Sequence, residues 1–447
     1  MSHDDNDLDL LASLIAKARR AGADGADALA VQSVALSHAR RLGKVEKLER
    51  AESRDVGLRV LIGQRQAIVS SSDRDTKALD ALVERAIAMA RAVPEDPFCA
   101  LAPADRLARE LPDLDICDPA EPAPEALIEA ARACEEAALA VPGITNSEGA
   151  EASWSLTSVS LAASNGFAGA YRVSRHGLAA SVVAGEGMGM ERDYEFSSAV
   201  RKADLDAPDA VGRRAAERAV RRLNPRKVKT AKLPIIFDPR VANSIPGHLA
   251  AAINGSAIAR GTSFLKDRLG QRVLPAGTRI VDDPRRLRGL RSKPFDGEGV
   301  ATARRNLVED GVLTTWLLDM RSARQLGLAT TGHAARGTSS PPSPSATNLY
   351  LEPGALSPAA LIAETGKGFY VTELIGFGIN GVTGDYSRGA VGLWIDGGTL
   401  ADPVSEVTIA GNLKDMLASV TPANDLAFRY GTDAPTLRID GMTVAGV

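Results

Sequence analysis

Residues 392–404 read GLWIDGGTLADPV, and this stretch decides the fold class of the second half of the chain. Apolar residues flank Asp396-Gly397, and such a pair favours the tight turn of a β-hairpin because both residues tolerate positive φ. The stretch NLVEDGVLTTWLLD at 306–319 repeats the pattern around Asp310-Gly311. Hairpins of this kind predict a mostly antiparallel sheet.

The first half of the chain carries both helical and strand patterns. Strand signals gather in 27–69, which contains DVGLRVLIG, and in 146–200, which turns at Asn165-Gly166. Apolar residues at helical spacing predict helices that start near residues 7, 76, 127 and 206. We therefore expect an α+β protein with three parts: two N-terminal subdomains of α/β type with helices on a sheet, and a C-terminal domain of mostly antiparallel sheet with a few helices. Their predicted ranges are 1–95, 96–225 and 226–447.

Composition narrows the class of protein. The net charge of −3 gives no general attraction to nucleic acid or acidic membranes, and the three cysteines form no CxxC pair. The N-terminus is acidic before it becomes basic, unlike a secretory signal. No stretch reaches the roughly 18–20 uninterrupted apolar residues of a membrane span. These features predict a cytoplasmic protein that does not bind membranes.

Two basic runs, 213–229 and 283–293, raise the question of nucleic-acid binding. Their cations fall all around the expected helix, and no aromatic residues interleave with them. We interpret them as solvated surface and expect no nucleic-acid partner. Cys134 lies on the apolar stripe of a helix, so we interpret it as a core residue rather than a reactive thiol.

Motifs for catalysis are scarce. The chain has no GxSxG elbow and no Walker loop. GFGING (376–381) matches GxGxxG, but turn and strand patterns follow it where a dinucleotide site needs a helix. A metal site remains open as an alternative: His248 and His333, with a carboxylate such as Glu298 or Asp385, supply the residue types that zinc binds.

Several segments of the second half follow one another in a recognisable order. They are INGSAIARGTSFLKDRLGQRV (253–273), FDGEG (295–299), LDMRSARQLGL (318–328), ATNLYLEPG (346–354), GINGVTGD (378–385), VSEVTIAGNLKDML (404–417) and APTLRIDGMTVAG (434–446). In this order the segments resemble the TldD/PmbA family. The resemblance covers nearly all of 230–447, and the weaker N-terminal pattern is compatible with it.

The family has a branch resembling TldD, with HExxxH on a helix and a cysteine ligand near the C-terminus for zinc. In SIPGHLAAAINGSAIARG (244–261), these three motif positions fall on Pro246, Gly247 and Ala251, and no cysteine follows Cys134. The resemblance therefore implies the PmbA (TldE) branch, with no catalytic residue, metal or cofactor in this chain. We interpret His248 as a partly exposed residue near a helix start, in a helix that Gly255 ends.

The resemblance implies a noncatalytic subunit of a heterodimeric metalloprotease, with zinc in a TldD-like partner. Such complexes act on unfolded or extended polypeptides, including leader removal from an antibiotic peptide precursor and antitoxin degradation. The chain alone could also form a homodimer. We predict that peptide or partner contacts involve Asn254, Thr383, Asp385 and Asn412, although turn and cap roles explain them equally well. The alternatives are a self-sufficient metallopeptidase using His248 and His333, and a regulator of the kind implied by the family's older label, modulator of DNA gyrase.

Overall fold

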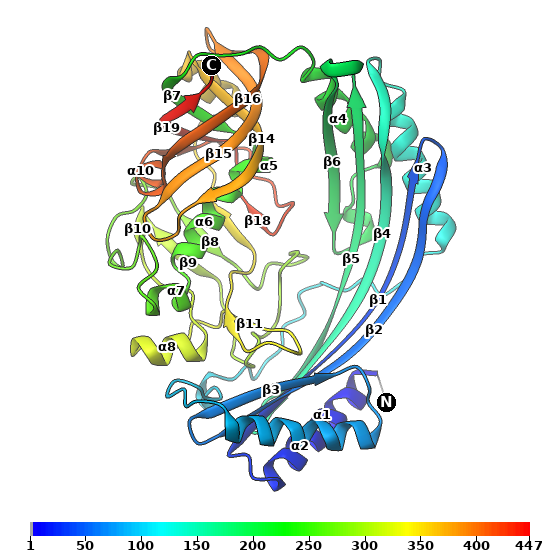
Figure 1. Cartoon of the computed structure of the whole chain (residues 1–447), viewed down its shortest axis with the longest axis vertical. Helices are drawn as coiled ribbons and strands as arrows, with labels where there is room; N and C mark the ends of the chain where they lie inside the picture. The colour runs from blue at the N-terminus through cyan, green and yellow to red at the C-terminus, as the bar shows by residue number, and fades with distance from the viewer. Residues whose placement is uncertain (1–2) are drawn as a thin grey trace.

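The computed structural model describes residues 3–447 and shows the strands of the first half joined in one curved antiparallel sheet (Figure 1). The strand order is β3-β2-β1-β4-β5-β6. The elements of this half are α1 (His3–Arg20), β1 (Gly25–Arg41), β2 (Lys44–Ile62), β3 (Arg65–Ser71), α2 (Thr76–Ala92), α3 (Pro124–Leu139), β4 (Ile144–Ala163), β5 (Ala168–Ala184), β6 (Glu191–Ala199) and α4 (Pro208–Arg221).

Helices cover one face of this sheet because alternate strand residues are small and apolar. Ala26, Ala28 and Ala30 of β1 contribute to the core beneath α1 and α2. Leu36, further along the same face of β1, packs with Trp154 beneath α3 and α4. The helices and the hairpin turn at Asn165-Gly166 agree with the sequence prediction.

The second half contains more, shorter elements. They are β7 (Ala231–Phe237), α5 (Pro239–Ala242), α6 (Ser244–Ala252), α7 (Gly255–Ala259), β8 (Ile280–Asp282), β9 (Arg305–Glu309), β10 (Val312–Leu313), α8 (Met320–Leu326), β11 (Ala334–Ala335), β12 (Ser343–Pro344), β13 (Leu349–Leu351), α9 (Pro358–Thr365), β14 (Gly368–Ile379), β15 (Asp385–Asp396), β16 (Thr399–Asn412), α10 (Leu413–Ala418), β17 (Val420–Pro422), β18 (Thr432–Asp433) and β19 (Leu437–Ala445).

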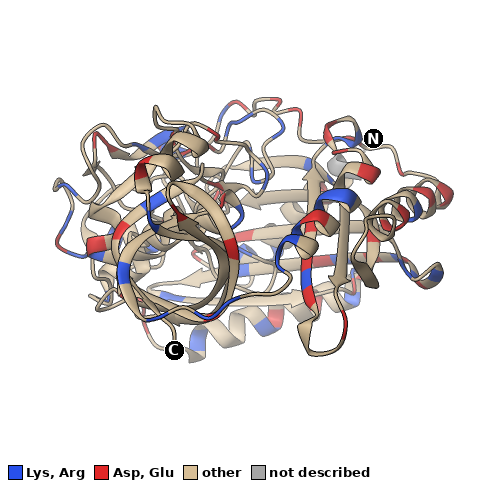
Figure 2. Ribbon diagram, turned by 90° about the horizontal axis from the view of Figure 1, so that it is seen from above, with Lys and Arg blue, Asp and Glu red and all other residues tan. Residues whose placement is uncertain are grey.

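Five of these strands, β7, β14, β15, β16 and β19, form a closed ring, and β17 pairs with β19 outside it. The sheet runs β16-β15-β14-β7-β19-β17, and a further pairing of β16 with β19 completes a ring that Figure 2 shows end-on. Only β7 and β14 pair in parallel within it. A smaller sheet, β10-β9-β8-β13-β18, lies beside the ring. Both predicted hairpins are present. The first turns at Asp310-Gly311, as predicted, and the second turns at Gly397-Gly398, one residue beyond the predicted pair. The α+β assignment is confirmed.

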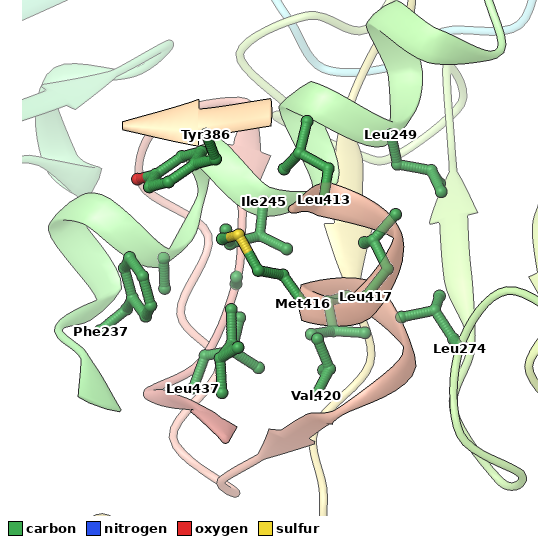
Figure 3. Packing of buried hydrophobic residues seen from close by; sticks show 14 of the residues in the cluster. Phe237, Ile245, Leu249, Leu274, Tyr386, Leu413, Met416, Leu417, Val420 and Leu437 are labelled. Atoms are coloured by element: carbon green, nitrogen blue, oxygen red, sulfur yellow. The ribbon is translucent and has the colours of Figure 1, made fainter. Parts of the chain in front are cut away.

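Helices α6 and α10 pack into one core with the ring strands. Figure 3 shows Ile245 and Leu249 of α6 meeting Met416 and Leu417 of α10, with Phe237 and Leu437 from adjacent strands at the edge of the group. Every one of these side chains is almost fully buried. The position of α6 is therefore fixed by apolar packing on several sides.

Several contacts join the halves, among them an aromatic cluster and a buried ion pair. The Phe295 ring lies with its centroid 4.9 Å from that of Phe167 and 5.3 Å from that of Tyr171. Close by in the fold, Arg336 of the second half donates to the buried carboxylate of Asp27, which also accepts from Arg59 Nε at 2.8 Å. The second half is thus fastened to the lower part of the helix-free sheet face.

Candidate functional site

Helix α6 holds the three positions that align with the HExxxH motif, and none of them carries a metal ligand. Pro246 lies in the first turn, as predicted, where its missing N–H breaks no helical hydrogen bond. Gly247 has no side chain, and a Cβ built there would meet no heavy atom within 4 Å. Ala251 supplies only a methyl group. The helix retains its place in the core but lacks the donor atoms of a metallopeptidase.

His248 is an isolated, uncharged imidazole. Its ring centroid lies 5.9 Å from that of Tyr386, and neither His248 Nε2 nor the Tyr386 hydroxyl has a hydrogen-bond partner among residues 3–447. Desolvation, and secondarily the charge of Arg388, lowers the pKa of His248 to about 4. The residue lies in the middle of α6 rather than at its start, so that detail of the prediction was wrong.

The residues present do not fit a zinc ion. Zinc needs three or four converging nitrogen, sulfur or carboxylate ligands. The side chain that faces His248 is instead Tyr386, and burial raises the pKa of its hydroxyl. Among the side chains that the structure describes, those of residues 6–447, no group of three or more His, Cys, Asp or Glu is arranged to hold a metal. The chemistry of zinc-activated water therefore has no support from these side chains.

His333 and Glu298, the other candidates for a metal site, belong to a separate buried network. His333 Nε2 lies 3.1 Å from Asp282 Oδ2, and its Nδ1 lies 2.9 Å from Thr331 Oγ1. Glu298 accepts a hydrogen bond of 2.8 Å from the Met320 amide. Burial, together with the charge of Asp296, raises the pKa of Glu298 to about 8. Each group is satisfied by a structural partner.

The predicted end of the opening helix was wrong. Helix α6 ends at Ala252, and Gly255 begins α7. The Asn254 side chain caps this new helix by accepting from the Ser256 amide at 3.0 Å, and its Nδ2 donates to the Pro344 carbonyl at 2.8 Å. Glycine is needed at 255 because a Cβ there would lie 2.8 Å from the Leu317 carbonyl oxygen.

Three of the four predicted contact residues come together, while Asn254 does not join them. Thr383 Oγ1 donates to Asp385 Oδ2 at 2.6 Å, and Asn412 Nδ2 donates to Asp385 Oδ1 at 3.2 Å. These two bonds lower the pKa of Asp385. The three side chains thus brace the turn between β14 and β15. Phe377, in the last part of β14 just before this turn, is 96% exposed.

Most cations of the basic run 213–229 are exposed, as predicted, but two of them are held in ion pairs against the N-terminal sheet. Arg218 of α4 contacts the buried carboxylate of Glu195, and Arg222, just after the helix, contacts Glu191 and Glu373. The reason is the alternation along β6, which places Glu191, Asp193 and Glu195 on the side facing α4. Arg218 and Arg222 are therefore neutralised within the chain.

A hollow on the helix-free face of the N-terminal sheet went unnoticed in the sequence. It has a volume of about 550 Å³ and continues, across Glu151, Ala179 and Phe196, into a second hollow of about 440 Å³. Its lining is mostly apolar, and the hydroxyl groups of Ser37, Ser153, Ser155 and Ser198 lie on this face of the sheet. The alternation SWSLTSVS at 153–160 is the signal that could have revealed it, because alternate residues of a strand share a face.

Family models match three consecutive parts of the chain. They describe domain 1 (residues 26–90), the central domain (117–223) and the C-terminal domain (230–446) of PmbA/TldA metallopeptidases. In addition, none of the helices within residues 3–447 is long and apolar enough to cross a bilayer.

Curated relatives match along nearly the whole chain. Metalloprotease PmbA of Escherichia coli O157:H7 is 40% identical over 95% of this chain and 92% of its own length. A PmbA homolog of Haemophilus influenzae is 38% identical over 96% and 94%. Among solved structures, one from Bacteroides thetaiotaomicron named as a modulator of DNA gyrase aligns with a TM-score of 0.92 at 28% identity over the full length of both chains. TldE of Thermococcus kodakarensis shares the fold, with a TM-score of 0.88 at 19% identity over 98% of this chain and 100% of its own.

Proposed function

Because this chain belongs to the PmbA/TldD family of metallopeptidases, we propose that it is the noncatalytic subunit of a two-subunit protease whose zinc is held by a TldD-like partner. The observation that carries the proposal is α6, with Pro246, Gly247 and Ala251 at the motif positions. The helix is kept in a tightly packed core although its chemistry is missing. Such retention suits a subunit whose shape serves the complex.

The substrate in this proposal is an unfolded or extended polypeptide, as in antibiotic-peptide leader removal or antitoxin degradation. The serine hydroxyl groups in the hollow support it, since they both donate to and accept from peptide groups without demanding a particular side chain. With Arg175 and Glu151 both in its lining, the hollow presents charges of both signs. It therefore suits a chain of mixed sequence.

For the partner contact we propose the end of the β14–β15 hairpin. Phe377 is 96% exposed, and Ile375 and Val382 are each 55% exposed. Exposed apolar side chains grouped in this way are typical of protein interfaces. In this arrangement Thr383, Asp385 and Asn412 act by bracing the turn that presents Phe377, while Asn254 caps α7.

The decisive experiment is co-expression with the TldD-like subunit of the same cell, followed by cleavage assays on an unfolded polypeptide. We expect cleavage only when both subunits are present, and loss of cleavage on chelation. His248→Ala in this chain should leave the rate unchanged, whereas loss of the partner's motif glutamate should abolish it. Cleavage by this chain alone, removed by a chelator and by His248→Ala, would instead support the self-sufficient metallopeptidase.

The contact surface has its own test. Phe377→Asp should prevent co-purification with the partner, while Leu287→Asp, at a side chain that is 66% exposed elsewhere, serves as the matched control. Thermal unfolding should be similar for both variants. Undiminished co-purification of Phe377→Asp would show that the partner binds another surface.

A further inference from the structure

The outer border of the N-terminal sheet is a long strand with one free edge. Strand β2 pairs with β1 along its whole length, but β3 covers its other edge only from Val56 onward. Residues 44–54 are exposed throughout and have no strand partner on that side among residues 3–447. This edge points away from the second half of the chain (Figure 1). Its free N–H and C=O groups are a template for another strand.

The sequence of this edge, KVEKLERAE at 44–52, is complementary to itself in the antiparallel direction. When Leu48 faces Leu48 of a second copy, Lys47 faces Glu49, Glu46 faces Arg50, and Lys44 faces Glu52. Val45 then faces Ala51. In an antiparallel pair, residues directly opposite lie on the same face, so each of these pairs is in contact.

The complementarity is specific to one register. Moving the two-fold axis by one residue places Lys47 against Lys47, or Glu49 against Glu49, and brings like charges together elsewhere along the edge. The ion pairs already present along this edge are exposed. Lys47 Nζ lies 2.9 Å from Glu49 Oε2, and Arg50, with 46% of its side chain exposed, pairs with Glu52 and Glu121, so these side chains can exchange partners.

We propose that two copies of this chain associate through antiparallel pairing of residues 44–52 of β2, with Leu48 on the two-fold axis. The two six-stranded sheets then form one continuous sheet across the dimer. This interface is isologous, as expected for a closed dimer, and it is separate from the β14–β15 hairpin end. It therefore holds whether or not the proposed function does.

Charge reversal tests the proposal. Lys47→Glu and Glu49→Lys should each weaken the dimer about tenfold or more, because each reverses two symmetry-related pairs. The double variant Lys47→Glu/Glu49→Lys should restore it, and so should mixing the two single variants, which complement each other. Lys77→Glu, an exposed change of the same charge on α2, is the matched control. Sedimentation equilibrium gives the dissociation constants.

Two results would overturn the proposal. One is a monomer at concentrations up to about 100 µM, where a micromolar association would be visible. The other is a dimer whose dissociation constant is unmoved by the single reversals and by Leu48→Asp. Hydrogen exchange supplies an independent readout, since amides within 45–51 should become protected with rising concentration. Cleavage together with the TldD-like partner should be unaffected by Lys47→Glu, which keeps this test distinct from that of the proposed function.

Discussion

Asp27→Asn should destabilise the protein more than any surface change, because it leaves two buried guanidinium groups without a counter-charge. The Asp27, Arg59 and Arg336 side chains are 2%, 3% and 1% exposed in their ion pairs. Arg336 Nε and Nη2 already lack partners within residues 3–447. Breaking a buried pair from one side costs about 3–5 kcal/mol. Asp80→Asn, which breaks an exposed pair with Lys17, should cost about 0–1 kcal/mol.

The pH dependence gives the same prediction a second test. Burial alone raises the pKa of Asp27, but Arg336 and Arg59 outweigh it and lower the pKa below the ordinary 3.8. The stabilisation by the Asp27 carboxylate is therefore fully present above pH 3.8 and is lost as the pH falls through the folded-state pKa. The difference in unfolding free energy between wild type and Asp27→Asn should shrink over that range.

Urea unfolding, followed by far-ultraviolet circular dichroism, measures these free energies. A loss below 1 kcal/mol for Asp27→Asn at pH 7 would refute the reasoning. It would mean that water or a shift of the loop compensates Arg336 when the carboxylate is gone. Equal losses for Asp27→Asn and Asp80→Asn would refute it as well.

Three further predictions concern single positions. Gly212→Ala should lower the unfolding free energy by about 1–3 kcal/mol in urea titration, because the added Cβ would lie 1.9 Å from the Cys134 carbonyl oxygen. By NMR titration, His248 should protonate near pH 4. Because folding lowers its pKa from 6.5, the unfolding free energy of wild type should decrease as the pH falls from 6.5 to 4, whereas that of His248→Phe should lack this decrease. Folding raises the pKa of Glu298 to about 8, so wild type should lose stability as the pH rises from 4.5 to 8, and Glu298→Gln should lose less. Thermal unfolding across pH checks this last prediction.

Local patterns predicted the local structure well. The helix expected to start near residue 76 is α2, Thr76–Ala92, because its apolar residues have helical spacing and Pro94 cannot continue it. Cys134 is fully buried, as predicted, and desolvation raises its pKa to about 12. The GFGING stretch leads from strand β14 through a turn into β15, which agrees with the rejection of a dinucleotide site.

Features that depend on distant partners could not be predicted. Asn254-Gly255 resembles a helix end, but contact with Leu317 and capping of Ser256 turn it into a helix start. The closed ring needs β16 to meet β19 and β7 to pair in parallel with β14, and neither pairing leaves a local pattern. The neutral state of His248 likewise depends on Tyr386 and Arg388 from a strand far along the chain.

The pairing of β19 with both β7 and β16 sets an order of events during synthesis. All strands of the N-terminal sheet and its four helices lie before residue 222, so their strand pairing can form while the ribosome is still translating the rest. The ring cannot be completed until residues 437–445 have left the exit tunnel. Its earlier strands must therefore wait with exposed apolar faces, and a stalled ribosome near the last codons would leave a nascent chain that needs chaperones.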